Sequence, residues 1–131
     1  HNDSHKFESN FVSLEIPKNN SVMFGSLSGT KLGVWVAHGE GKFEFPYEEK
    51  EYNIIAKYNY DGYPANPNGS PWSVAGVCSK DGRHLAMMPH PERAIFPWQC
   101  GYYPADRKEN DEVTPWIEAF VNARKWIENN K

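Results

Sequence analysis

The sequence has little cysteine, no long apolar run and no excess of basic side chains. Its two cysteines among 131 residues form neither a disulfide framework nor the paired spacing of a zinc site. No apolar stretch approaches the roughly 20 residues that span a bilayer, and no signal peptide is visible. The 14 basic and 17 acidic side chains give a formal net charge of −3, without the basic stripe typical of nucleic-acid binding. We expect a cytoplasmic chain with no metal site and no membrane or nucleic-acid partner.

Hydrophobic patterning predicts short strands separated by turns, and a chain of this length has room for one modest core. No segment repeats, and none has low complexity. Residues 23–29 predict a helical turn closed by glycine, and Asp81-Gly82 predicts the turn of a hairpin. Strands are predicted at residues 11–16, 32–37, 53–60, 73–78 and 84–88.

One long helix is predicted near the C-terminus. Thr114 is a suitable N-cap residue, and Pro115 suits the first helical position because its missing N–H would have no intrahelical partner there. Apolar side chains then recur at helical spacing from Trp116 to Ile127. We expect this helix to cover the sheet with its apolar face.

The segment Met87-Met88-Pro89-His90-Pro91-Glu92-Arg93 places a histidine and a carboxylate two residues apart, just after a predicted strand. In an extended chain, side chains at i and i+2 point the same way, and the flanking prolines favour extended geometry. Such a pair can act as the base and the orienting group of a nucleophilic triad. Taken alone, the pair is more often a strand-end turn with two solvated side chains.

Two further loops carry polar and glycine residues. His38-Gly39-Glu40-Gly41 follows a predicted buried strand, and its glycines permit a ligand to approach the backbone closely. Asn66-Pro67-Asn68-Gly69-Ser70 is rich in residues whose side chains hydrogen-bond to their own backbone in turns. Each loop by itself is also compatible with a purely structural turn.

These motifs, together with the opening segment from His1 to Glu8, resemble the glutaminase region of the phosphoribosylformylglycinamidine synthases. Those glutaminases are class I (triad) glutamine amidotransferases. Residues 116–125 are similar to the C-terminus of the large, single-chain form of the family. The resemblance extends over nearly the whole chain, with the motifs in the family's order.

The resemblance implies an α/β fold that forms the second half of a class I glutamine amidotransferase domain, with a mixed, mostly parallel sheet and flanking helices. It implies a parent enzyme that releases ammonia from glutamine. This ammonia would serve the ATP-dependent conversion of formylglycinamide ribonucleotide to formylglycinamidine ribonucleotide in de novo purine biosynthesis. ATP and Mg²⁺ would belong to the parent synthase domain, and this segment would hold no cofactor.

The resemblance also implies roles for individual residues. His90 would deprotonate the catalytic cysteine, and Glu92 would orient His90. The family usually has arginine where this chain has Asn10, so any charge-dependent contact made by that arginine is absent. The residues expected to bind the substrate or to border the active-site mouth are His38, Gly39, Glu40, Asn66, Asn68 and Ser70.

The catalytic cysteine itself is not found in this sequence. In the family it sits on a glycine-flanked strand-to-helix elbow, upstream of the segment with which this chain begins. Cys78 is followed by a turn signal rather than a helix, and Cys100 lies in a loop rich in aromatic residues and proline. We therefore expect residues 1–131 to be the C-terminal portion of a glutaminase domain, inactive on its own. Its expected partners are glutamine, the rest of the parent enzyme and, through the truncated face, a second copy.

Two other functions are compatible with the residues. The chain could be a stand-alone thiol hydrolase that uses Cys78, His90 and Glu92. It could also be a non-catalytic assembly module whose loops serve only as an interface. Activity of the purified chain, and its dependence on Cys78, distinguishes these alternatives from the glutaminase fragment.

Overall fold

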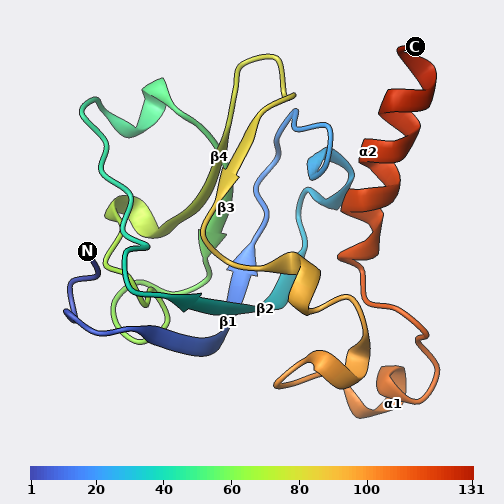
Figure 1. The fold of residues 1–131 in the computed structure, drawn as a ribbon, viewed down its shortest axis with the longest axis horizontal. Coiled ribbons are helices and arrows are strands. Elements are labelled where there is room, and N and C mark those ends of the chain that lie inside the picture. The colour runs from blue at the N-terminus through green and yellow to red at the C-terminus, as the bar shows by residue number, and fades with distance from the viewer.

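The computed structural model describes residues 1–131, and its framework is one five-stranded sheet (Figure 1). The strands lie in the order β2-β1-β3-β4-β5, and every neighbouring pair is antiparallel. Two α-helices follow the last strand along the chain. The bounds are Glu8–Glu15 for β1, Lys31–His38 for β2, Asn53–Tyr58 for β3, Val74–Cys78 for β4, Leu85–Met87 for β5, Ala105–Lys108 for α1 and Ile117–Asn129 for α2.

The α/β class and the predicted strands are confirmed, and each strand end lies within three residues of its predicted position. The expected hairpin joins β4 to β5, with Gly82 at a φ of +76° in its turn. The predicted helical turn is a 3-10 turn, η1 (Gly25–Leu27), and Gly29 follows it at a φ of +84°. Glycine adopts such left-handed angles without the steric cost that a Cβ brings.

The sheet differs from the expectation in the direction of its strands, because none of its pairs is parallel. Parallel neighbours need a crossover connection, usually through an α-helix. Here the connections between strands contain only 3-10 turns, namely η1, η2 (Glu49–Glu51) and η3 (Pro71–Ser73). Both α-helices come after β5, so neither can serve as a crossover between the five strands.

The hydrophobic core lies on one face of the β1–β2 pair. Side chains alternate between the two faces of a strand, so Val12 and Leu14 of β1 point to the same buried face as Val34 and Val36 of β2. Trp116, just before α2, is fully buried in the same cluster. The core therefore joins the first hairpin of the sheet to the start of the C-terminal helix.

Helix α2 is anchored to the sheet near its beginning. The indole N–H of Trp116 donates to the Gly33 carbonyl of β2 at 2.8 Å, and Ala119 is the one buried residue within the helix. Farther along, the Asn122 amide donates to the Met23 carbonyl beside η1. Figure 1 shows α2 at one side of the molecule, so it covers less of the sheet than the sequence predicted. Its apolar side chains that remain at least 39% exposed are Phe120, Val121 and Ile127.

The start of α2 also differs from the prediction. Thr114 does not cap the helix, because its hydroxyl donates to the Ala94 carbonyl at 2.5 Å. Its N–H donates to the Ile95 carbonyl at 2.7 Å, and α2 begins only at Ile117. Thr114 thus fixes the loop that precedes the helix rather than the helix itself.

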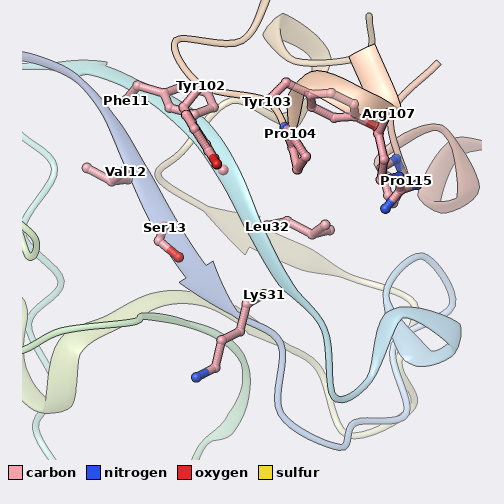
Figure 2. Close-up of a pocket in the computed structure, with 11 residues that line it drawn as sticks. Phe11, Val12, Ser13, Lys31, Leu32, Tyr102, Tyr103, Pro104, Arg107 and Pro115 are labelled. Atoms are coloured by element: carbon pink, nitrogen blue, oxygen red, sulfur yellow. The ribbon is translucent and has the colours of Figure 1, made fainter. Parts of the chain in front are cut away.

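Part of the chain between β5 and α2 lies on the opposite face of the β1–β2 pair. The Trp35 indole N–H donates to the Gln99 carbonyl at 2.7 Å, and its ring packs edge-on against Phe11 with centroids 5.0 Å apart. This segment also forms a pocket of about 400 Å³ over the two strands, with Phe11 and Tyr102 in its walls (Figure 2). The 3-10 turns within the segment are η4 (Pro91–Arg93) and η5 (Pro97–Gln99).

Replacing Trp116 by alanine should strongly destabilise the fold. The change removes a fully buried indole and leaves the Gly33 carbonyl without its donor, so we expect the free energy of unfolding to fall by about 3–5 kcal/mol. Urea denaturation followed by circular dichroism measures the loss. The matched control is Trp98→Ala, because Trp98 is 73% exposed and its removal should change that free energy by less than about 0.5 kcal/mol. Equal losses in the two variants would contradict the assignment of Trp116 to the core.

Candidate functional site

His90 lies in the loop that follows β5, and its backbone is fixed to the edge of the sheet. Its N–H donates to the Trp35 carbonyl of β2 at 2.8 Å, and the two residues form an isolated antiparallel bridge. Pro91 starts the 3-10 turn η4 immediately afterwards. The imidazole therefore projects from a backbone that is held on both sides.

The side chains of His90 and Glu92 meet directly. Nδ1 of His90 lies 2.8 Å from Oε1 of Glu92, so the contact predicted from the sequence is confirmed. The predicted cause is wrong, because Glu92 lies in η4 rather than in extended chain, and the Arg93 N–H donates back to the His90 carbonyl at 3.0 Å. A tight turn that begins at Pro91, not strand alternation, brings the carboxylate onto the ring.

The contact with Glu92 determines which nitrogen of His90 is free. An ionised carboxylate only accepts hydrogen bonds, so Nδ1 of His90 donates to Glu92 and Nε2 keeps its lone pair. The His90 side chain retains 28% of its exposure, which leaves room for a reactant at the ring. A histidine held in this way can take a proton from a thiol and return it to a leaving group.

A second histidine lies beside the first. His38 ends β2, and its ring centroid is 6.3 Å from that of His90. Its Nε2 lies 2.9 Å from Oδ1 of Asn68, a fully buried residue. The sequence predicted His38 and Asn68 at the site from two separate loops, and the structure brings the two side chains into contact.

The amide groups of Asn2 and Asn68 fix the direction of these hydrogen bonds. The Asn2 nitrogen donates to the carbonyls of Lys6 and His38, each at 2.8 Å. Its oxygen therefore accepts from the Gly41 N–H at 2.9 Å and from the Asn68 nitrogen at 2.8 Å. The Asn68 oxygen is thereby turned toward His38, which must donate from Nε2 and leaves Nδ1 as an acceptor.

Burial favours the neutral form of His38. Desolvation lowers the pKa of His38 below its ordinary value of 6.5, and the hydrogen bond to Asn68 opposes this effect less strongly. The Asn68 oxygen also accepts from the Tyr58 hydroxyl at 3.0 Å, and burial raises the pKa of Tyr58, so that hydroxyl keeps its proton. Two histidines thus lie side by side in opposite tautomers, with the proton on Nδ1 of His90 and on Nε2 of His38.

The loop after β2 contributes its backbone to this arrangement. The Gly39 carbonyl accepts the Asn2 N–H at 3.1 Å. A Cβ on Gly41 would lie 2.2 Å from Cδ2 of His38, so the close approach of the loop to the ring requires glycine. The Glu40 side chain is 74% exposed and pairs with His1 at 3.2 Å. The structure therefore does not bring the Glu40 carboxylate to the two histidines.

Within the loop from Asn66 to Ser70, only the Asn68 side chain reaches the histidines. The Asn66 amide donates to the Ser70 carbonyl at 2.9 Å, and the Ser70 hydroxyl accepts the Phe43 N–H at 3.0 Å. All three polar side chains of this loop are buried. Asn66 and Ser70 hold the loop in shape, while Asn68 connects it to the site.

Sequence reasoning missed Glu8 and Tyr58. Glu8 starts β1 on the same face as Val12 and Leu14, because alternate residues of a strand share a face, and it is buried. A charged residue in the buried register of a strand is a signal that could have found it. Tyr58 gave no such signal, because its partner Asn68 lies ten residues away in a loop.

The cysteine of the thiol-hydrolase alternative lies away from His90. Cys78 pairs with Leu85, at the end of the β4–β5 hairpin opposite to the loop that carries His90. A strand advances about 3.3 Å per residue, so the step from Leu85 to Met88 alone separates the two ends by roughly 10 Å. The thiol instead donates to the Ser79 carbonyl at 3.1 Å, and burial raises the pKa of Cys78, which disfavours the reactive thiolate.

No group of three or more histidine, cysteine, aspartate or glutamate side chains is placed to hold a metal ion. No helix of the structure combines the length and the apolarity of a membrane span. The site consists of an oriented base, His90 with Glu92, beside a neutral histidine held by buried amides.

Comparison with known proteins places this chain in a family. A family model described as the CobB/CobQ-like glutamine amidotransferase domain matches residues 1–127. The probable chloroplastic/mitochondrial phosphoribosylformylglycinamidine synthase of Arabidopsis thaliana is 43% identical over 142 residues, covering 98% of this chain and 10% of the relative. The phosphoribosylformylglycinamidine synthase of Homo sapiens is 43% identical over 138 residues, covering 96% of this chain and 10% of the relative. The chain thus spans about a tenth of the length of these relatives.

A solved structure shares the fold. The structure of PurLQS from Thermotoga maritima matches with a TM-score of 0.72 and 25% sequence identity, over 96% of this chain and 50% of that chain. The family model, the sequence relatives and the fold agree. The chain belongs to the CobB/CobQ-like glutamine amidotransferase domain family.

Proposed function

We propose that this chain is the part of a phosphoribosylformylglycinamidine synthase that carries the base of its glutaminase site. The site hydrolyses glutamine, and the ammonia serves the ATP-dependent conversion of formylglycinamide ribonucleotide to formylglycinamidine ribonucleotide in purine biosynthesis. The named relatives are such synthases, and the chain spans about a tenth of each. ATP and Mg²⁺ therefore belong to the synthase domain of the parent enzyme rather than to this segment.

The observation that carries the proposal is the contact between His90 and Glu92. A distance of 2.8 Å between a fixed imidazole and a carboxylate is the geometry of a base and its orienting group. Nε2 of His90 is the atom left for a nucleophile. We assign the nucleophile to a cysteine of the upstream glutaminase segment, because Cys78 lies at the far end of the β4–β5 hairpin and burial raises the pKa of Cys100.

In the proposed reaction, Nε2 of His90 takes the proton of the cysteine thiol. The thiolate sulfur attacks the carboxamide carbon of glutamine, so that a C–S bond forms, and the C–N bond breaks as His90 returns the proton to the departing ammonia. Water, deprotonated by the same nitrogen, then attacks the thioester carbon, so that a C–O bond forms. The C–S bond breaks, glutamate is released, and His90 returns the proton to the departing cysteine sulfur. Glu92 holds Nδ1 throughout and stabilises the imidazolium that forms in each half of the cycle.

Exposed aromatic side chains support packing against the rest of the parent enzyme. Aromatic residues are enriched at protein interfaces, and large exposed apolar patches mark interaction surfaces. Trp98 stacks on Phe96 with ring centroids 5.9 Å apart, which makes a flat apolar surface at η5. We infer that the synthase body and the upstream glutaminase segment cover such surfaces, and that the separated chain self-associates through them. The aromatic side chains that are at least 66% exposed are Phe7, Tyr47, Tyr60, Tyr63, Trp98 and Tyr102.

The separated chain of 131 residues should not hydrolyse glutamine. Loss of one triad member typically lowers the rate by roughly 10⁴-fold or more, and burial raises the pKa of both Cys78 and Cys100, which disfavours either thiol as a substitute. A coupled assay for glutamate, with the parent enzyme as the positive control, measures the activity. Turnover by the purified chain that Cys78→Ala abolishes would refute the glutaminase fragment and establish the stand-alone thiol hydrolase.

In the parent enzyme, Glu92→Gln should lower the kcat for glutamine hydrolysis by roughly 10⁴-fold, because the neutral amide no longer fixes the tautomer of His90 or stabilises its imidazolium. Synthesis with ammonium salts as the nitrogen donor should be unchanged, because free ammonia does not need the base. Paired assays with glutamine and with ammonia separate the two activities.

The matched control for this variant is Glu112→Gln, a change of the same chemistry at an exposed residue that forms no ion pair. It should leave both activities at the level of the unmodified enzyme. Equal losses of glutamine- and ammonia-dependent synthesis in Glu92→Gln would show that Glu92 supports the fold. That result would contradict the proposed role of Glu92 in orienting His90.

A further inference from the structure

Glu8 is a buried carboxylate without a matching partner. The residue is only 8% exposed, and its Oε1 is the one buried side-chain oxygen or nitrogen of the structure without a hydrogen-bond partner. Its other oxygen lies 3.5 Å from the Tyr63 hydroxyl, at the limit of a hydrogen bond. Burying a carboxylate is unfavourable unless it is paired and hydrogen-bonded. The Glu8 carboxylate therefore needs a further hydrogen-bond donor, which the chain itself does not supply.

The sheet register places this carboxylate at the site. Glu8 of β1 pairs directly with His38 of β2, and side chains directly opposite in an antiparallel pair have Cβ atoms about 4.5–5.5 Å apart. The ring of His38 is in turn 6.3 Å from the ring of His90. Glu8 thus lies directly opposite His38, and His38 is the neighbour of the proposed base, His90.

No basic side chain of this chain pairs with Glu8, since its carboxylate is in none of the ion pairs. His38 does not supply a proton either, because its Nε2–H is directed to Asn68 at 2.9 Å, which leaves only the acceptor Nδ1. This corner of the site therefore offers a carboxylate and an imidazole lone pair, and no free donor. Its chemical complement is a cation with several N–H groups, which is a primary ammonium.

We propose that Glu8 binds the α-ammonium group of the glutamine substrate and thereby selects an α-amino acid. The inference rests on the proposed glutaminase function. In glutamine, four covalent bonds separate the α-nitrogen from the carboxamide carbon, a span of about 5 Å. Glu8 is opposite His38, and the His38 ring is 6.3 Å from the His90 ring, so a glutamine that lies along the two histidines would direct its ammonium toward Glu8 and its carboxamide toward His90.

The test uses the parent enzyme and two substrates, glutamine and 4-carbamoylbutanoate, which is glutamine without its amino group. The unmodified enzyme should hydrolyse glutamine with the higher kcat/KM. Glu8→Gln should lower kcat/KM for glutamine by roughly 10²-fold, mainly through KM, because a buried charged pair is broken. The same variant should leave the value for 4-carbamoylbutanoate nearly unchanged. Glu8→Asp, which keeps the charge, should recover part of the preference.

The matched control is Glu15→Gln, because Glu15 is in the same strand but exposed, and it should leave both values unchanged. Equal losses for the two substrates in Glu8→Gln would show a structural role for Glu8, such as pairing with a cation of another segment, and would overturn the proposal. An unmodified enzyme with equal kcat/KM for the two substrates would also overturn the proposal. This measurement needs no variant, so it does not depend on whether a variant folds. A parent enzyme that hydrolyses no glutamine would instead contradict the proposed function itself.

Discussion

Strand β2 is one of the two edge strands of the sheet, and its outward carbonyl groups fix the positions of two distant parts of the chain. The Trp35 carbonyl accepts the N–H of His90, and the Gly33 carbonyl accepts the indole N–H of Trp116. An edge strand without such partners would leave a row of unpaired backbone groups. Because His38 ends the same strand, its position relative to His90 is set by the geometry of β2.

The two histidines of the site are held by chemically different partners. A carboxylate, Glu92, binds Nδ1 of His90 and favours its charged form during a reaction, whereas the neutral amide of Asn68 binds Nε2 of His38. Burial also lowers the pKa of His38, so this ring contributes an acceptor and no charge. In the proposed reaction, this division assigns proton transfer to His90 alone and leaves His38, with Glu8 opposite it, to contact the substrate.

The features that could be predicted from the sequence depend on short stretches of chain. Apolar strand patterns and turn glycines predicted all five strands and the β4–β5 hairpin. The spacing of His90 and Glu92 predicted their contact, although a turn at Pro91 produces it rather than extended chain. The strand directions and the position of α2 could not be predicted, because they depend on contacts between residues far apart in the chain. The hydrogen bond of Asn68 to Asn2 spans 66 positions, and that of Trp116 to Gly33 spans 83. Such contacts leave no periodic pattern in the sequence.

The central claim is that Glu92 and Asn68 hold His90 and His38 in opposite tautomers. Long-range ¹H–¹⁵N correlation spectra of the imidazole rings in the ¹⁵N-labelled chain, recorded above the ordinary pKa of histidine, measure this directly. His90→Gln and His38→Gln variants assign the two signals. The account predicts a proton on Nδ1 of His90 and on Nε2 of His38. A proton on Nε2 of His90 would contradict it, because that nitrogen could then not accept a proton from a thiol.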